Sequence, residues 1–137
     1  MRALIDTSSL FKKYVEEIGS EKIEQILEEL SEVAVSPVTW MELNAIIARR
    51  LREKSVTSQQ ALWLKSQAHK DFQSFHRVVW NESLEKTAVQ LIEQHSLSTL
   101  DAIQLASAKL AKTRQLVTSD HALARAAQKE VAQVMVI

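Results

Sequence analysis

The stretch from Arg2 to Leu10 constrains the fold of this chain most strongly. It begins with a short apolar run, reaches a carboxylate at Asp6 and continues into three hydroxyl residues. This order is typical of a buried strand that passes directly into a helix. Ligands of open parallel sheets bind in the crevice outside the carboxyl ends of the strands. We therefore expect Asp6 to lie where a ligand binds.

The rest of the chain repeats this pattern of short apolar runs separated by helical periodicity. Further strands are predicted at residues 33–35, 77–80, 115–118 and 133–137. Helices are predicted over residues 9–18, 20–30, 39–53, 57–75 and 84–92. Another helix follows the turn at residues 97–100 and runs to about Lys112, and the last helix starts at Asp120. Five short strands alternating with helices indicate an α/β fold, a parallel sheet covered on both faces with the first strand in its centre.

Composition limits both the size and the chemistry of the protein. A length of 137 residues predicts a single domain spanning residues 1–137. No run of about 18 apolar residues is present, so we expect no membrane span. The chain has no cysteine, which excludes disulfides, thiolate zinc sites and cysteine nucleophiles and favours a cytoplasmic location.

Charge is balanced overall, with 17 basic and 17 acidic residues. A balanced chain has no global field that would attract nucleic acid. Basic residues nevertheless cluster at 49–54 and at 109–114. These clusters are interpreted either as solvated helix faces or as a local basic patch.

Four acids occupy equivalent places in the predicted fold: Asp6, Glu42, Asp101 and Asp120. Each lies at the end of a strand or in the first turn of a helix, so all four are expected at one edge of the sheet. Taken singly, each has a structural explanation as a helix cap, and the segments 39–42 and 98–101 match the capping-box pattern. Their joint placement favours a shared site instead.

Carboxylates crowded together repel one another unless a cation lies between them. Oxygen ligands without histidine or cysteine select magnesium or manganese. Such a metal can orient a phosphodiester, activate water and stabilise the leaving oxygen. The pattern therefore predicts hydrolytic phosphoryl transfer at a nucleic-acid backbone.

At these residues the chain resembles the PIN-domain ribonucleases, and in particular the VapC-like toxins of bacterial toxin-antitoxin pairs. The similarity rests on four segments: Leu4–Leu10, Trp40–Leu43, Leu97–Ala106 and Val117–Asp120. The third segment is the most specific.

This resemblance implies a three-layer α/β/α PIN-like domain with a central parallel sheet of about five short strands. It implies an endoribonuclease in which Mg²⁺ or Mn²⁺ is held by four catalytic acids: Asp6, Glu42, Asp101 and Asp120. Thr7 and Thr118 would be supporting polar neighbours. A cognate antitoxin protein and a homodimer are the implied partners besides RNA.

Two positions depart from the family pattern. Many relatives have histidine where this chain has Gln104, and many have glycine near Glu130 and Val131. Neither position is an expected metal ligand. They leave substrate choice and the geometry of the last turn open.

Other functions are less well supported by the residues. A phosphatase or receiver-like domain using Asp6 as a covalent acceptor would need a second Asp at the position of Ser8. His69 and His76 lack the further ligands that zinc requires. A non-catalytic RNA-binding or partner-binding module that keeps the acids as caps is the main alternative. Trp63, which falls outside the apolar stripe of its helix, is a candidate for a dimer or antitoxin surface.

Overall fold

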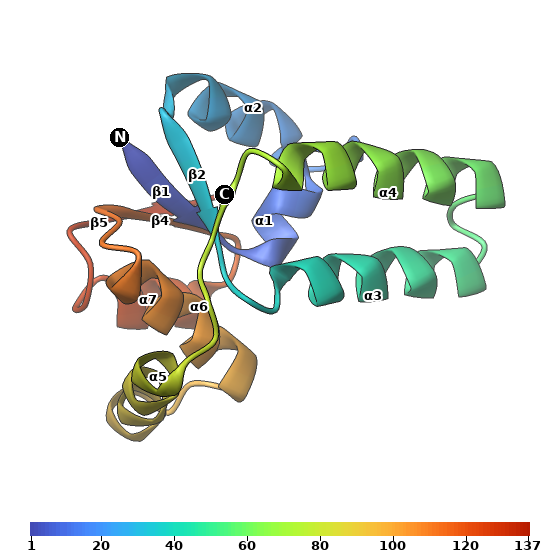
Figure 1. The fold of residues 1–137 in the computed structure, drawn as a ribbon. Helices are drawn as coiled ribbons and strands as arrows, with labels where there is room; N and C mark the ends of the chain where they lie inside the picture. The colour runs from blue at the N-terminus through green and yellow to red at the C-terminus, as the bar shows by residue number, and fades with distance from the viewer.

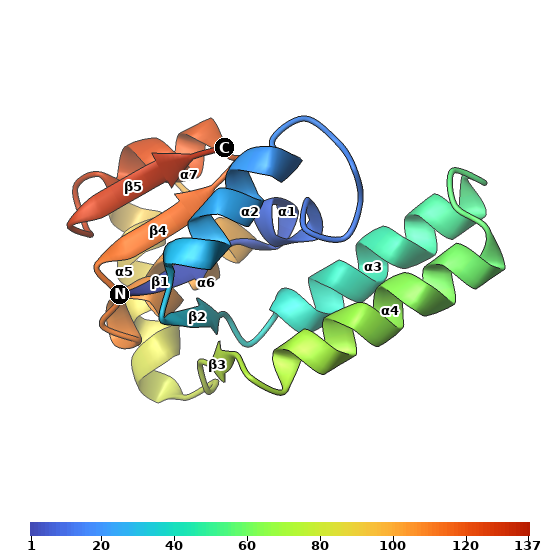
Figure 2. The ribbon, with the colours of Figure 1, turned by 90° about the horizontal axis from the view of Figure 1, so that it is seen from above.

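The chain folds into a parallel sheet of five strands in the order β3-β2-β1-β4-β5 (Figure 1 and Figure 2). This computed structural model describes residues 1–137. The strands are β1 (Arg2–Ile5), β2 (Glu32–Val35), β3 (His76–Arg77), β4 (Gln115–Thr118) and β5 (Gln133–Val136). The helices are α1 (Thr7–Phe11), α2 (Ser20–Glu29), α3 (Thr39–Arg52), α4 (Ser58–Phe72), α5 (Glu82–His95), α6 (Thr99–Leu110) and α7 (His121–Ala127).

Strand β1 lies at the centre of the sheet, as the sequence predicts. Leu4 is in register with Ala34 of β2 on one side and with Leu116 of β4 on the other. The chain thus winds in one direction from β1 to β3 and in the other from β4 to β5. Asp6, directly after β1, lies at the switch point between these two halves.

The two faces of the sheet carry separate apolar cores. Leu4 packs with α5, α6 and α7, whereas Ala3 and Ile5 pack with α1 to α4. Because successive residues of a strand point to opposite faces, an uninterrupted apolar run is required to fill both cores. This arrangement confirms the three-layer α/β/α architecture. None of its helices has the length and apolar character needed to cross a membrane.

Helices α3 and α4 form an antiparallel pair that projects from the body of the molecule, here called the arm (Figure 2). A capping box between Thr57 and Gln60 begins α4. At the base of the arm, Asp71 accepts a hydrogen bond of 2.8 Å from the Tyr14 hydroxyl and pairs with Lys13. These contacts fix α4 against the segment that follows α1.

The predicted helix over residues 9–18 is wrong in its length. Helix α1 ends at Phe11, and a tight turn follows in which the amides of Lys12 and Lys13 bond to carbonyls three residues earlier. The early end lets Tyr14 reach the arm and leaves Ile18 exposed. Gly19 has a φ of +98°, a backbone conformation that residues with a side chain rarely adopt. A residue with a Cβ at this position would also clash, because the Cβ would lie 2.5 Å from Cγ2 of Ile137.

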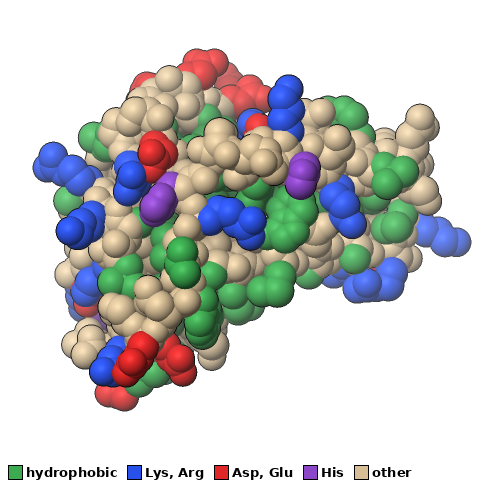
Figure 3. All heavy atoms as spheres, in the orientation of Figure 1, with side chains coloured by type: hydrophobic (Ala, Val, Ile, Leu, Met, Phe, Trp, Pro, Cys, Tyr) green, Lys and Arg blue, Asp and Glu red, His purple; other side chains and the backbone are tan.

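The predicted strand over residues 77–80 is also wrong in its extent. Only His76 and Arg77 pair with β2, and the amide of Val78 makes one further bond to Val35. The chain then leaves the sheet and crosses to α5 (Figure 1), so Val79 and Trp80 are 71% and 50% exposed. Figure 3 shows apolar side chains gathered on this face between the arm and α5.

Candidate active site

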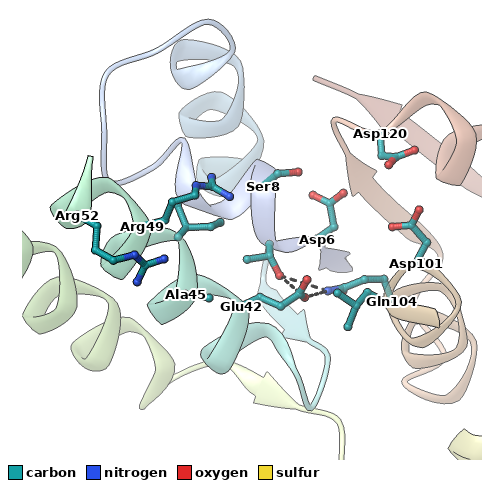
Figure 4. A pocket seen from close by; sticks show the side chains of 12 residues that line it. Asp6, Ser8, Glu42, Ala45, Arg49, Arg52, Asp101, Gln104 and Asp120 are labelled. Atoms are coloured by element: carbon teal, nitrogen blue, oxygen red, sulfur yellow. Dashed lines mark hydrogen bonds between the residues drawn. The ribbon is translucent and has the colours of Figure 1, made fainter. Parts of the chain in front are cut away.

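A cavity of about 440 Å³ opens at the carboxyl edge of the sheet, and all four predicted acids line it (Figure 4). Asp6 comes from the end of β1, Glu42 from α3, Asp101 from α6, and Asp120 from the loop between β4 and α7. The structure thus brings together residues that are up to 114 positions apart in the chain.

Asp6 is the most deeply placed of the four, with 5% of its surface exposed. One carboxylate oxygen accepts the Ser9 amide at 3.0 Å and thereby caps α1. The other oxygen accepts a hydrogen bond from the Thr118 hydroxyl. Burial raises the pKa of Asp6, and the hydrogen bonds from Thr118 and Ser9 oppose that rise.

Asp120 caps the last helix through one of its two oxygens. Its Oδ1 accepts the amide of Leu123 at 2.9 Å, while its own amide donates to the Thr118 hydroxyl oxygen at 3.0 Å. Thr118 therefore links Asp6 to the backbone of Asp120. The capping interpretation is correct for Asp6 and Asp120, yet Oδ2 of Asp120 forms no hydrogen bond and is left for another ligand.

Asp101 lies in the first turn of α6, which Ser98 caps by accepting the Asp101 amide at 3.3 Å. Burial raises the pKa of Asp101, and the negative charges of Asp120, Asp6 and Glu42 raise it further. The carboxylate is thus close enough to the other three acids to be repelled by each of them.

Glu42 is oriented by two hydrogen bonds rather than by a helix cap. Its Oε1 accepts the Thr7 hydroxyl at 2.8 Å and the Gln104 amide at 2.9 Å. The predicted capping box at residues 39–42 is wrong, because Val38 occupies the cap position and the Thr39 hydroxyl bonds to Ser36 instead. Glu42 therefore has no capping role.

Gln104 is a neighbour of the acids whose contacts the sequence did not predict. It is 3% exposed, and its amide nitrogen also donates to Thr7 at 3.3 Å. Its carbonyl oxygen is buried without a hydrogen-bond partner, although Gln104 lines the cavity. The signal in the sequence was its spacing of three residues from Asp101, which places both side chains on neighbouring positions of one helix face.

The charges of the cavity are divided between its walls. None of the four acids forms an ion pair with a basic residue. Arg49 and Arg52 of α3 line the opposite wall, as Figure 4 shows. Four carboxylates without a counter-ion and without histidine or cysteine form a donor set that suits a hard divalent cation. In the arrangement described, no three acidic or histidine side chains converge closely enough to hold an ion by themselves.

Comparison with known proteins identifies a family and a set of structural relatives. The family model described as PIN domain matches residues 3–129. A toxin-antitoxin complex from Klebsiella pneumoniae has a TM-score of 0.65 and 23% identity, with 86% of each chain covered. FitAcB from Neisseria gonorrhoeae has a TM-score of 0.72 and 19% identity over 96% of each chain. For the sarcin-ricin loop cleaving toxin VapC20 of Mycobacterium tuberculosis the values are 0.62 and 16%, with 83% of this chain and 86% of that chain covered. No curated protein matches the sequence.

Proposed function

Because the chain belongs to the PIN domain family, we propose that it is a metal-dependent endoribonuclease that hydrolyses RNA phosphodiester bonds. The observation that carries this proposal is the cavity lined by Asp6, Glu42, Asp101 and Asp120. None of these acids forms an ion pair with a basic residue. Unpaired and partly buried acids destabilise a fold, so their presence in one cavity is explained best by a ligand that supplies positive charge.

No three of these side chains converge on one point, but Mg²⁺ commonly keeps several waters and is bound through only one or two carboxylates. The four acids would therefore hold Mg²⁺ or Mn²⁺ together with water, since carboxylate oxygens favour these cations. A divalent cation there supplies an activated water and offsets the negative charge that develops on the leaving oxygen. Hydrolysis adds the water oxygen to phosphorus and breaks the bond to the 3′ oxygen, which takes up a proton. The products would carry a 5′-phosphate and a 3′-hydroxyl.

The neighbouring side chains would keep these acids in place. Thr118 donates to Asp6 and accepts from the amide of Asp120, which fixes their separation. Thr7 and Gln104 both donate to Glu42, so this carboxylate is held from two sides. Such supporting hydrogen bonds keep the metal-binding side chains oriented before the metal arrives. Arg49 and Arg52 would bind the phosphates of the RNA.

The same reasoning extends to partners. The relatives from Klebsiella pneumoniae and Neisseria gonorrhoeae are a toxin-antitoxin complex and FitAcB, and VapC20 is described as a toxin. We propose that this chain is likewise the toxin of such a pair, a homodimer bound by an antitoxin protein. Trp63 and Leu62 support this, because they are 55% and 70% exposed on the arm and are available to a protein partner.

The test of the nuclease is cleavage of a mixed RNA pool by the purified, partner-free protein. Reactions contain Mg²⁺, Mn²⁺ or a chelator, and Asp6→Asn is assayed beside the wild type. We expect metal-dependent cuts that leave 5′-phosphates and disappear in the variant. If both proteins fold and bind RNA but neither cleaves it, the acids serve as caps and the chain is a non-catalytic RNA-binding or partner-binding module.

A further inference from the structure

Gln104 is the one residue of the cavity that has a buried side-chain atom without a hydrogen-bond partner. It lies in α6, three residues after Asp101, and is 3% exposed. Its amide nitrogen donates to Oε1 of Glu42 at 2.9 Å and to the Thr7 hydroxyl oxygen at 3.3 Å (Figure 4). Its carbonyl oxygen is buried and accepts no hydrogen bond. Because buried polar atoms of folded proteins are nearly always paired, this oxygen indicates a missing donor.

Glu42 fixes the direction in which the Gln104 amide points. Turning the amide over would place the carbonyl oxygen 2.9 Å from Oε1 of Glu42, and two acceptors at that distance repel each other. The Thr7 hydroxyl does not satisfy the carbonyl oxygen either, because it has one proton and donates it to Glu42 at 2.8 Å. Neither of the two side chains bonded to Gln104 therefore supplies the missing donor.

The donor that fits this position is one that enters the cavity with a ligand. The four acids suit a divalent cation, and since no three of them converge on one point, the ion keeps several waters. Water bound to a divalent cation is more acidic than bulk water and is therefore a strong hydrogen-bond donor. Such waters need acceptors around them. The carbonyl oxygen of Gln104 is an acceptor beside these acids that no group of the protein uses.

We propose that Gln104 binds the hydrated cation directly, through a hydrogen bond that its carbonyl oxygen accepts from a water of the hydration shell. The residue then has two separate functions. Its amide nitrogen orients Glu42, and its carbonyl oxygen holds the hydrated ion. A glutamine suits both functions because one planar group carries a donor and an acceptor and has no charge. This inference rests on the proposed nuclease function and adds a residue to its cation site.

The test is a calorimetric titration of hexaamminecobalt(III) into the metal-free protein. This complex has the shape of a hexahydrated cation, but its ammonia ligands do not exchange, so it binds only through charge and hydrogen bonds. The wild type is compared with Gln104→Leu, Glu42→Ala and the double variant, and Mn²⁺, which accepts protein ligands directly, is titrated in parallel. Gln104→Met, which keeps the length of the side chain, serves as a second variant.

Gln115→Leu is the matched control. It also removes a buried glutamine amide, but Gln115 lies at the start of β4 and does not line the cavity. Circular dichroism melting verifies that each variant folds, and RNA cleavage with Mn²⁺ is measured for all of them.

Gln104→Leu and Gln104→Met should each weaken binding of the cobalt complex by about tenfold, a loss typical of removing a contact around a metal site. Binding of Mn²⁺ should weaken in the same direction. Glu42→Ala separates the two functions of Gln104, because no carboxylate is left for the amide to orient. Most of the loss should therefore remain when Gln104→Leu is added to Glu42→Ala. The control should bind as the wild type does.

Two results would overturn the inference and leave the nuclease intact. One is a wild type that binds Mn²⁺ and cleaves RNA, but in which Gln104→Leu costs no affinity once Glu42 is alanine, since Gln104 would then act through Glu42 alone. The other is Mn²⁺ binding that Gln104→Leu weakens while the cobalt complex binds unchanged or not at all, since the oxygen would then be a direct ligand. A wild type that binds neither ion and cleaves no RNA would instead remove the proposed function.

Discussion

The two ends of helix α6 place a carboxylate in opposite electrostatic surroundings. In its first turn, Asp101 is partly buried beside Asp120, Asp6 and Glu42, and burial with these charges raises its pKa. Near its last turn, Lys109 binds Glu130 at 2.8 Å, and His95 bonds to the other oxygen of that residue. These two contacts lower the pKa of Glu130.

The difference shows that an acid with a purely structural role, such as Glu130, is paired with basic residues in this fold. Glu130 joins the end of α5 to the end of α6 through two basic partners, which is a structural use of charge. The cavity acids have no such partners although two arginines line the same cavity. Acids that lie together without a counter-ion and have raised pKa values are typical of functional sites.

Replacing Asp101 by asparagine gives the largest expected effect. The change removes one negative charge from the proposed metal site but keeps the size of the side chain. RNA cleavage should fall on the order of a thousandfold, because several kcal/mol of transition-state stabilisation are lost. Initial rates of cleavage with Mn²⁺ measure the effect.

Asp71→Asn is the matched control, since Asp71 is the one aspartate of the chain outside the cavity. It should reduce stability by about 1 kcal/mol by weakening the contacts with Tyr14 and Lys13, and it should cleave RNA at nearly the wild-type rate. Equal rates for Asp101→Asn and the wild type would mean that the unpaired acid has no catalytic use.

A smaller effect is expected at Gln104. Gln104→Leu removes the amide that donates to Glu42, so cleavage should fall by about 10-fold to 100-fold, as is common when a supporting contact of a ligand is lost. Gln104→His keeps a donor at this position and should retain most of the activity. If leucine and histidine behave alike, packing rather than the hydrogen bond explains the loss. When the rate is titrated against Mn²⁺, the leucine variant should need a higher Mn²⁺ concentration for half-maximal activity.

The smallest effects concern stability against pH, and they have opposite signs at the two ends of α6. A raised pKa in the folded state favours folding at acid pH, and this contribution is lost as pH rises through the folded pKa. Asp101→Asn should therefore become more stable than the wild type as pH rises above about 4, the unperturbed value of an aspartate.

Glu130 has a lowered pKa, so its stabilisation is present above its unfolded pKa and is lost as pH falls through its folded pKa. Glu130→Gln should consequently lower the free energy of unfolding by about 1 kcal/mol at neutral pH and by less in acid. Urea unfolding in chelator at several pH values measures both variants. The comparison would be contradicted if the free energies of unfolding of both variants, relative to the wild type, changed in the same direction as pH rises.

The sequence predicted the sheet well where a single physical requirement dominates. Strands β1 and β4 are buried on both faces, and adjacent apolar residues supply both cores: Ala3 to Ile5 in β1, and Leu116 and Val117 in β4. The errors arose where tertiary contacts override local pattern. The first helix ends early and Tyr14 bonds to Asp71 of the arm instead of continuing the helix, and Trp80 leaves the sheet although its segment has strand composition.

The acids of the site were predictable for a geometric reason, because strand ends and helix starts of a parallel sheet share one edge. Their supporting contacts were not. Gln104 meets Glu42 across 62 positions of sequence, and no local pattern encodes that pairing.

The most direct test of the central claim is a calorimetric titration of Mn²⁺ into the metal-free protein at pH 7 and at pH 5. We expect binding at pH 7 that weakens at pH 5, because the raised pKa values of Asp6 and Asp101 let protons compete with the metal, and we expect it to be lost in Asp101→Asn but kept in Asp71→Asn. Binding that is absent at millimolar Mn²⁺, or that is equally strong in Asp101→Asn, would contradict the claim that these acids are held for a cation.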